Sequence, residues 1–215
     1  MANKETKIYI VRHGQSVGNL TRTILGHTDL DLTDLGHEQA NECARFLSCV
    51  SFDKIYSSDL KRALSTAKPH ADMRKMPIIK AAELRELYFG DWDGAPVASV
   101  ADTKEFSEDW KTGFGTFTAP NGESVEALAT RVYNYILNAA KENEGATLLF
   151  VFHAAAIRSF WGKISKIDPR ELGTKLPFPL NASVSTALYK DGEIIPKEYS
   201  NASFLEETSK SVIAF

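Results

Sequence analysis

The 215-residue chain has only two cysteines, and its longest apolar runs, such as 148–152, are far too short to cross a bilayer. Cys43 and Cys49 fall six residues apart in one predicted helix, so their side chains point to different faces and a disulfide between them is not expected. The polar residues 1–7 do not resemble a secretion signal. We therefore predict reduced thiols, a cytoplasmic location and no membrane association.

The chain also lacks an excess of basic charge. It has 25 lysines and arginines against 28 acidic residues, for a formal net charge of -3. Proteins that bind nucleic acids or anionic membranes need a basic surface to displace counterions, so we expect neither partner, and any anion site must be local. Hydrophobic content of 43% with 25% charged residues is typical of a folded globular chain.

Hydrophobic patterning alternates between strand and helix periodicity. Apolar runs predict strands at 8–11, 54–57, 77–80, 147–152, 184–189 and 193–199, with a hairpin at Asp191-Gly192 between the last two. Helical spacing predicts helices that follow the capping residues Thr33, Asp59 and Ser124, and another over 154–166. Residues 88–123 carry glycines, prolines and aromatics without clear periodicity.

This order predicts the α/β class, as a three-layer α/β/α sandwich with a mainly parallel central sheet and an antiparallel edge near the C-terminus. We expect one domain over residues 1–215, with an irregular lid insertion at about 88–123. Sites in such sheets lie beyond the carboxyl ends of the strands. Arg12-His13 and His153 both follow predicted strands, and the helix start after each would favour an anion.

Several short sequence blocks follow one another along the chain around these positions. They are RHGQSVGN at 12–19, LTDLG at 32–36 with QA at 39–40, YSSDLKRA at 56–63 with TA at 66–67, LREL at 84–87 with FGDWDG at 89–94, GES at 122–124 and FH at 152–153. An Arg-His-Gly triplet alone arises often by chance, but the ordered series does not. The series resembles the histidine phosphatase superfamily, which includes cofactor-dependent phosphoglycerate mutases.

The resemblance implies a set of catalytic roles. His13 matches the nucleophile that becomes phosphohistidine, and Glu86 matches the proton donor and acceptor, for which the pKa must be raised. Arg12, Arg62 and His153 match the residues that surround the phosphate, with His153 as a transition-state stabiliser that could be protonated. Arginine suits this role because its planar fork contacts phosphate oxygens in pairs, and with such a cationic cradle no metal is required.

Two further positions complete the predicted phosphate site. Asn19 can add a neutral donor, and Ala154 stands where relatives have glycine after the second histidine. Alanine there costs little if the backbone has a negative φ, and its N–H still points at the anion. Leu25 replaces a polar residue of many relatives, so no phosphate contact is assigned to it.

For other candidate site residues, a purely structural role is at least as well supported as a role in the site. Gly26, His27 and Trp92 are possible substrate-binding residues, whereas His37 and His70 fit surface positions better. Arg158 could reach the pocket, but a structural ion pair fits it better. The remaining aromatic residues of the lid are expected to form its small core: Phe106, Trp110, Phe114 and Phe117.

The resemblance leaves three functions open. Mutases of the family have adjacent lid arginines that hold a second anionic group, whereas residues 88–130 contain only Lys104 and Lys111 as basic residues, against eight acids. We therefore predict a phosphatase that acts on a small phosphorylated metabolite, as a monomer or homodimer without a cofactor. The alternatives are a phosphoglycerate mutase, which would require 2,3-bisphosphoglycerate, and a module that binds a phosphorylated ligand without turnover.

Overall fold

The computed structural model describes residues 5–110 and 113–210 and contains one six-stranded sheet. The strands are β1 (Thr6–Arg12), β2 (Lys54–Ser58), β3 (Ile78–Ala81), β4 (Thr147–Phe152), β5 (Val184–Lys190) and β6 (Glu193–Asn201). Their order is β3-β2-β4-β1-β5-β6, in which the first four are parallel while β5 and β6 are antiparallel to their neighbours. The predicted sheet and its antiparallel edge are confirmed.

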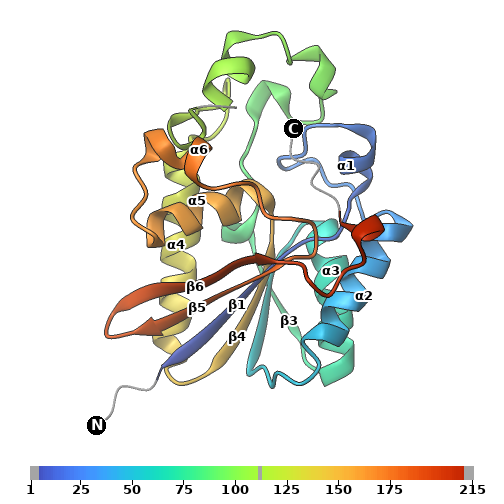
Figure 1. Cartoon of the computed structure of the whole chain (residues 1–215), viewed down its shortest axis with the longest axis vertical. Coiled ribbons are helices and arrows are strands. Elements are labelled where there is room, and N and C mark those ends of the chain that lie inside the picture. The colour runs from blue at the N-terminus through green and yellow to red at the C-terminus, as the bar shows by residue number, and fades with distance from the viewer. Residues whose placement is uncertain (1–4, 111–112, 211–215) are drawn as a thin grey trace.

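Helices cover both faces of this sheet. They are α1 (Val17–Thr21), α2 (Asp34–Phe46), α3 (Lys61–Arg74), α4 (Val125–Glu142), α5 (Ala154–Ile164) and α6 (Leu172–Lys175). Figure 1 shows α4 and α5 on one side of the sheet and α2 and α3 on the other. One hydrophobic core lies under each helix pair, so the three-layer architecture is also confirmed.

Two of the three predicted helix caps are present in the structure. Thr33 Oγ1 accepts the N–H of Gly36 at 3.1 Å, and Ser124 Oγ accepts that of Ala127 at 3.1 Å, so both predicted caps are confirmed. The predicted cap at Asp59 is wrong. Leu60 occupies the N-cap position of α3, because the Asp59 carboxylate instead accepts two hydrogen bonds from Arg85, which follows β3.

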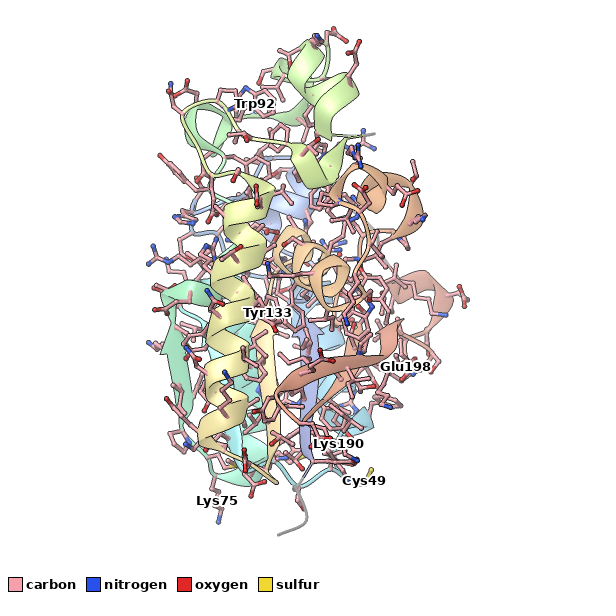
Figure 2. All side chains as sticks on the ribbon, turned by 90° about the vertical axis from the view of Figure 1, so that its left-hand side faces the viewer. Cys49, Lys75, Trp92, Tyr133, Lys190 and Glu198 are labelled. Carbon is pink, nitrogen blue, oxygen red and sulfur yellow. The ribbon has the colours of Figure 1, made fainter. Side chains whose placement is uncertain are left out.

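The segment between β3 and α4 contains residues 88–123, for which a lid was predicted, and lies above the carboxyl ends of the parallel strands (Figure 1). It contains short 3-10 turns at Gly90–Trp92, Val97–Ser99 and Phe114–Thr116 and a π-helix at Glu105–Trp110. Figure 2 shows Trp92 at this end of the molecule and Lys75 at the other. The base of the lid is tight at Gly90, where φ is +55° and a Cβ would lie 2.0 Å from a backbone oxygen.

Three predictions about individual side chains have clear outcomes. Both cysteines are free, as predicted, although α2 ends before Cys49 and leaves it exposed. His37 is exposed as expected. The surface prediction for His70 is wrong, because the buried face of α3 is wide enough to include His70 beside its alanines, and the exposed fraction of His70 is 0%. No helix of the described ranges is both long and apolar enough to span a membrane.

Candidate active site

Backbone pairing between β1 and β4 brings the two strand-end histidines together. Arg12 pairs with Phe152 in the sheet, and the backbone N–H of His13 donates to the Phe152 carbonyl at 2.9 Å. His13 and His153 therefore leave the same edge of the sheet side by side, with ring centroids 5.2 Å apart. Their proximity is a consequence of strand register.

The hydrogen bond of the His13 ring defines its tautomer. Nδ1 lies 2.7 Å from the carbonyl oxygen of Gly14, which can only accept, so Nδ1 carries the proton and Nε2 keeps its lone pair. Only 4% of the residue is exposed. Burial, and then the positive charges of Arg62 and Arg12, hold the pKa of His13 well below its ordinary value, so the ring is neutral.

His153 makes two side-chain contacts that keep it neutral. Its Nδ1 accepts a hydrogen bond from Arg62 Nε at 3.2 Å, and its Nε2 lies 2.8 Å from Ser58 Oγ. Because arginine only donates, Nδ1 must be unprotonated, and burial lowers the pKa of the ring well below its ordinary value. A protonated His153 does not fit this arrangement. The residue lies behind Arg62 and does not line the pocket.

Arg12 and Arg62 provide the positive charge of the site. Arg62 lies in the first turn of α3 and donates to the carbonyls of Thr28 and Gly26 at 2.9 and 2.8 Å. Arg12 Nη1 donates to the Pro179 carbonyl at 2.6 Å. Burial lowers the pKa of each guanidinium to about 10, so both remain charged at neutral pH.

A polar stripe along α3 supports the loop that begins at His13 and Gly14. Arg62, Thr66 and His70 follow one another at intervals of four residues and so share a face of the helix. Thr66 Oγ1 donates to the Arg62 carbonyl at 2.8 Å and accepts the backbone N–H of Gly14 at 3.0 Å. On its other side, Gly14 lies so close to Gly36 that a Cβ would be 2.3 Å from that carbonyl oxygen.

Glu86 lies at the N-terminus of α5, where backbone N–H groups have no intrahelical acceptor. Its Oε1 accepts from the amides of Ala156 and Leu87 at 3.0 and 2.9 Å, and its Oε2 accepts from Ala155 at 3.0 Å. Burial raises the pKa of Glu86, against the opposite effect of these donors. Ala154 is the first residue of α5 and does not have a positive φ, so the condition set for alanine at this position is met.

Arg131 holds the backbone that carries Glu86. It donates to the carbonyls of Glu83, Arg85 and Glu86 at 2.8, 2.8 and 2.9 Å. The same guanidinium binds both carboxylate oxygens of Glu123, at 2.7 and 2.8 Å, at the end of the lid. Arg131 thus connects the loop of the predicted acid to the base of the lid.

The amide of Asn19 is oriented by its neighbours. Its Oδ1 accepts from the Ser16 backbone N–H at 3.1 Å and from Asn181 Nδ2 at 3.3 Å, which directs Nδ2 away from both donors. Ser16 Oγ in turn accepts the Asn19 N–H at 3.2 Å, and this capping box begins α1. Both residues line the pocket described next.

One pocket collects most of the predicted site residues, within about 390 Å³ of empty space that includes its open mouth. Its polar part combines the predicted nucleophile and the predicted acid with two arginines and neutral donors: His13, Glu86, Arg12, Arg62, Ser16 and Asn19. Its other wall is apolar and is formed by Leu25, Phe89, Trp110, Phe178, Ala154 and Ala155. In the described chain, no group of three or more His, Cys, Asp or Glu side chains is arranged to hold a metal ion.

Three predicted substrate-binding residues lie outside this pocket. Trp92 is buried in the aromatic core of the lid, with its ring 5.8 Å from Phe117. The His27 ring lies 5.1 Å from that of Tyr88 and contacts the Glu86 carbonyl at 3.2 Å. Gly26 acts through its carbonyl, which binds a cradle arginine. Such non-local packing has no signature in the sequence pattern.

The loop of Gly26 is itself held by a lid carboxylate. Asp93 accepts the backbone N–H groups of Gly26, His27 and Thr28 at 3.0, 2.6 and 3.2 Å. The carbonyls of this loop then face Arg62. Asp93 therefore has a structural role. Its negative charge is partly balanced by these backbone N–H groups, so it contributes less to repulsion of an anionic substrate than its count in the lid implies.

Arg158 makes neither of the two contacts considered for it. It is buried, and it donates to the carbonyls of Leu176 and Gly173 at 2.6 and 2.8 Å rather than to a carboxylate. Its guanidinium lies over the rings of Phe114 and Phe178, 4.4 and 4.2 Å from their centroids. The expected ion pair is wrong, because backbone carbonyls and aromatic faces satisfy this cation.

Sequence reasoning missed several residues that the structure places in or against the site. Ser58 lies within the YSSDLKRA block and contacts His153, and Arg131, one residue beyond 88–130, holds the Glu86 backbone. Trp110 was assigned to the lid core alone. A ring between two prolines, as at Phe178, is a signal that could have been used, since prolines restrict the backbone around it.

Comparisons with known proteins agree with this geometry. The family model of the histidine phosphatase superfamily (branch 1) matches residues 8–202. The chain is 30% identical over 200 residues to the uncharacterized phosphatase PhoE of Bacillus subtilis, with 93% of this chain and 97% of the relative covered. It is also 30% identical over 207 residues to phosphoglycerate mutase-like protein 4 of Arabidopsis thaliana, with 94% and 88% covered. The structure of Bacillus stearothermophilus YhfR superposes with a TM-score of 0.87 at 25% identity, with 94% of this chain and 100% of that chain covered.

Proposed function

The chain belongs to the histidine phosphatase superfamily (branch 1), and from this premise we propose that it hydrolyses phosphate monoesters through a phosphohistidine formed at His13. Its relatives are phosphatases and phosphoglycerate mutases, so it is an enzyme. The observation that carries the proposal is the uncharged Nε2 of His13, which shares one pocket with two arginines and a buried carboxyl group.

In the first step, His13 Nε2 attacks phosphorus as the bond to the ester oxygen breaks. Arg12, Arg62 and Asn19 bind the phosphoryl oxygens and stabilise the charge that develops on them. The Gly14 carbonyl stabilises the Nδ1–H of the ring as it gains positive charge. Glu86, entering in its protonated form, gives its proton to the leaving oxygen, so that a neutral alcohol departs.

The proton of Glu86 belongs on Oε2. Among the described contacts Oε1 accepts two backbone N–H groups and Oε2 only one, so Oε2 has the acceptor position left for a proton. A dianionic ester beside it raises the pKa further, in the same direction as burial. The incoming substrate thus promotes the protonation state that the first step needs.

In the second step, water replaces the alcohol. Glu86, now a carboxylate, takes a proton from the water as its oxygen attacks phosphorus and the phosphorus–nitrogen bond breaks. Inorganic phosphate leaves, and the neutral form of His13 is restored. His153 acts in both steps through Arg62, whose guanidinium it orients from behind the pocket.

The residues that line the pocket favour water, rather than a second hydroxyl of the substrate, as the acceptor of the phosphoryl group. A bisphosphate would need a second cationic site, whereas the lining cations of the described residues are Arg12 and Arg62. Lys111, one of the two lid lysines, lies outside the described residues. The acidic lid is the weaker argument, because Asp93 and Glu123 bind backbone amides and Arg131. The apolar wall supports hydrolysis without 2,3-bisphosphoglycerate.

The test is hydrolysis of p-nitrophenyl phosphate by wild type and His13→Ala, together with alkaline quench of the wild-type reaction. We expect an acid-labile, base-stable phosphoenzyme only when His13 is present. Equal residual rates in both proteins would instead support a binding module. Interconversion of phosphoglycerates that depends on added 2,3-bisphosphoglycerate would support the mutase reading against hydrolysis.

A further inference from the structure

The turn that leads into β5 lies directly against the strand end that carries His13. The backbone N–H of Ala182 donates to the His13 carbonyl at 3.2 Å, and the backbone N–H of Arg12 donates to the Ser183 carbonyl at 3.2 Å. These two hydrogen bonds continue the antiparallel pairing of β1 with β5 beyond the last pair of the ladder. The turn therefore borders the proposed nucleophile on the β5 side, as His153 does on the β4 side.

The contacts around this turn hold it in a backbone conformation that alanine does not favour. Ala182 has a φ of +54°, in the left-handed region that residues with a Cβ rarely adopt, and it is fully buried. Ser183 Oγ donates to the Leu180 carbonyl at 2.7 Å, and the Leu180 N–H donates to Ser200 Oγ at 2.9 Å. Such a conformation persists only where the surrounding structure fixes it. The place of Asn181, the second residue of the turn, is fixed with it.

Asn181 uses its side-chain amide on two residues of the site. Its Nδ2 donates to the His13 carbonyl at 3.1 Å and to Asn19 Oδ1 at 3.3 Å. An amide nitrogen carries two hydrogens, so these two acceptors account for both. The exposed fraction of Asn181 is 0%, and the residue does not line the pocket. It can therefore act on a substrate only through the residues that it holds.

The hydrogen bond to Asn19 decides which end of that amide faces the phosphate site. Asn19 Oδ1 accepts from Asn181 Nδ2 and from the Ser16 backbone N–H, so the amide nitrogen of Asn19 is directed to the other side. In this orientation Asn19 can donate to a phosphoryl oxygen, whereas the flipped amide would place an oxygen against the negative charge of the ester. The orientation thus determines whether Asn19 attracts or repels the phosphoryl group.

Resting on the proposed hydrolase function, we propose that Asn181 is a positioning residue of the phosphate site. One of its N–H groups fixes the Asn19 amide with its donor towards the phosphoryl group, and the other fixes the peptide from which the His13 ring projects. Asn181 thus connects the nucleophile to a phosphate donor without touching the substrate. A residue that only stabilised the turn would have no such connection to Asn19.

The test is a double-mutant cycle on phosphate binding and turnover. Asn181→Leu has a similar size and removes both donors. It should weaken the binding of inorganic phosphate, measured by isothermal titration calorimetry, and raise KM for benzyl phosphate, each by about 2- to 10-fold, the value of one hydrogen bond. In an Asn19→Ala background the same substitution should leave the phosphate Kd nearly unchanged, because the group that it orients is absent. The effect that passes through the His13 peptide should remain in both backgrounds as a lower kcat.

The matched control is Ser183→Ala, which loosens the same turn from a side chain that contacts Leu180 and Ser200 instead of the site. It should lower the thermal midpoint, and its effect on the phosphate Kd should be the same with and without Asn19→Ala. If Asn181→Leu does not fold, Asn181→Ser, which keeps one donor, takes its place in the cycle. Equal losses of phosphate affinity in the two backgrounds would overturn the positioning role. A wild type that binds phosphate but forms no phosphoenzyme would remove the proposed function and leave the binding cycle readable.

Discussion

Replacing His70 by leucine should stabilise the protein, and more so in acid than at neutral pH. His70 is fully buried in α3, and neither ring nitrogen has a hydrogen-bond partner among the described residues. Burial, with a smaller effect of the Arg74 charge, lowers its pKa from the ordinary 6.5 to about 3. Leucine has a similar volume and no polar atoms, so it removes the cost of the buried polar ring.

The magnitude follows from proton linkage. Because the folded-state pKa is lowered, the unfolded chain binds a proton that the folded chain does not, and stability is lost as pH falls from 6.5 towards 3. pH 5 lies about 1.5 units below the ordinary pKa of His70 in the unfolded chain. At about 1.36 kcal/mol per unit, protonation of the unfolded chain lowers the free energy of unfolding by about 2 kcal/mol. At pH 7 the linkage is close to zero, and the unpaired polar atoms alone cost about 1–3 kcal/mol.

Urea denaturation followed by tryptophan fluorescence at pH 7 and pH 5 measures both effects. The unfolding free energy of His70→Leu should exceed that of wild type by about 1–3 kcal/mol at pH 7, and the difference should grow by about 2 kcal/mol at pH 5. His37→Leu, at an exposed position of α2, is the matched control. A difference that stays the same at the two pH values would refute a neutral, buried His70.

Three further predictions concern the catalytic machinery. Glu86→Gln should lower kcat/KM for benzyl phosphate by about 10²–10⁴, and it should remove the loss of wild-type activity that occurs as pH rises through the raised pKa of this acid, seen in a pH–rate profile. Arg131→Met should reduce kcat with little change in KM and shift the same alkaline limb, whereas Lys141→Met on the exposed end of α4 should change neither. Gly14→Ala should lower both kcat and the thermal midpoint, because its Cβ would lie 2.3 Å from the Gly36 carbonyl oxygen; wild-type values of both would contradict that close approach.

Much of the fold could be predicted because its signals are local. The buried strand before His153 was predicted at residues 147–152, as the structure has it, since a continuous apolar run ended by a polar residue needs no tertiary information. Strand ends then indicated where His13 would lie. The burial of His70 is not predicted, because helical spacing identifies the apolar stripe but does not show that the buried face extends to the polar positions beside it.

The apolar wall of the pocket could not be predicted in the same way. Trp92 and Trp110 are both lid aromatics with similar neighbours, and only the path of the lid decides which one reaches the pocket. Phe178 approaches from a loop 68 residues beyond Trp110, counted from their numbers, so no periodicity relates the two. Their meeting depends on long-range closure of the chain over the sheet.

The distance between the two histidine rings, 5.2 Å, is close to the separation of neighbouring strands, about 4.8 Å. The spacing of the proposed nucleophile and its neighbouring histidine is thus set by the ladder between β1 and β4. Substitutions along these strands can change the packing around the site without changing that spacing, provided the ladder stays in register. An insertion or deletion of a single residue within either strand would displace one ring from the other, so this protein should tolerate sequence drift here far better than changes in strand length.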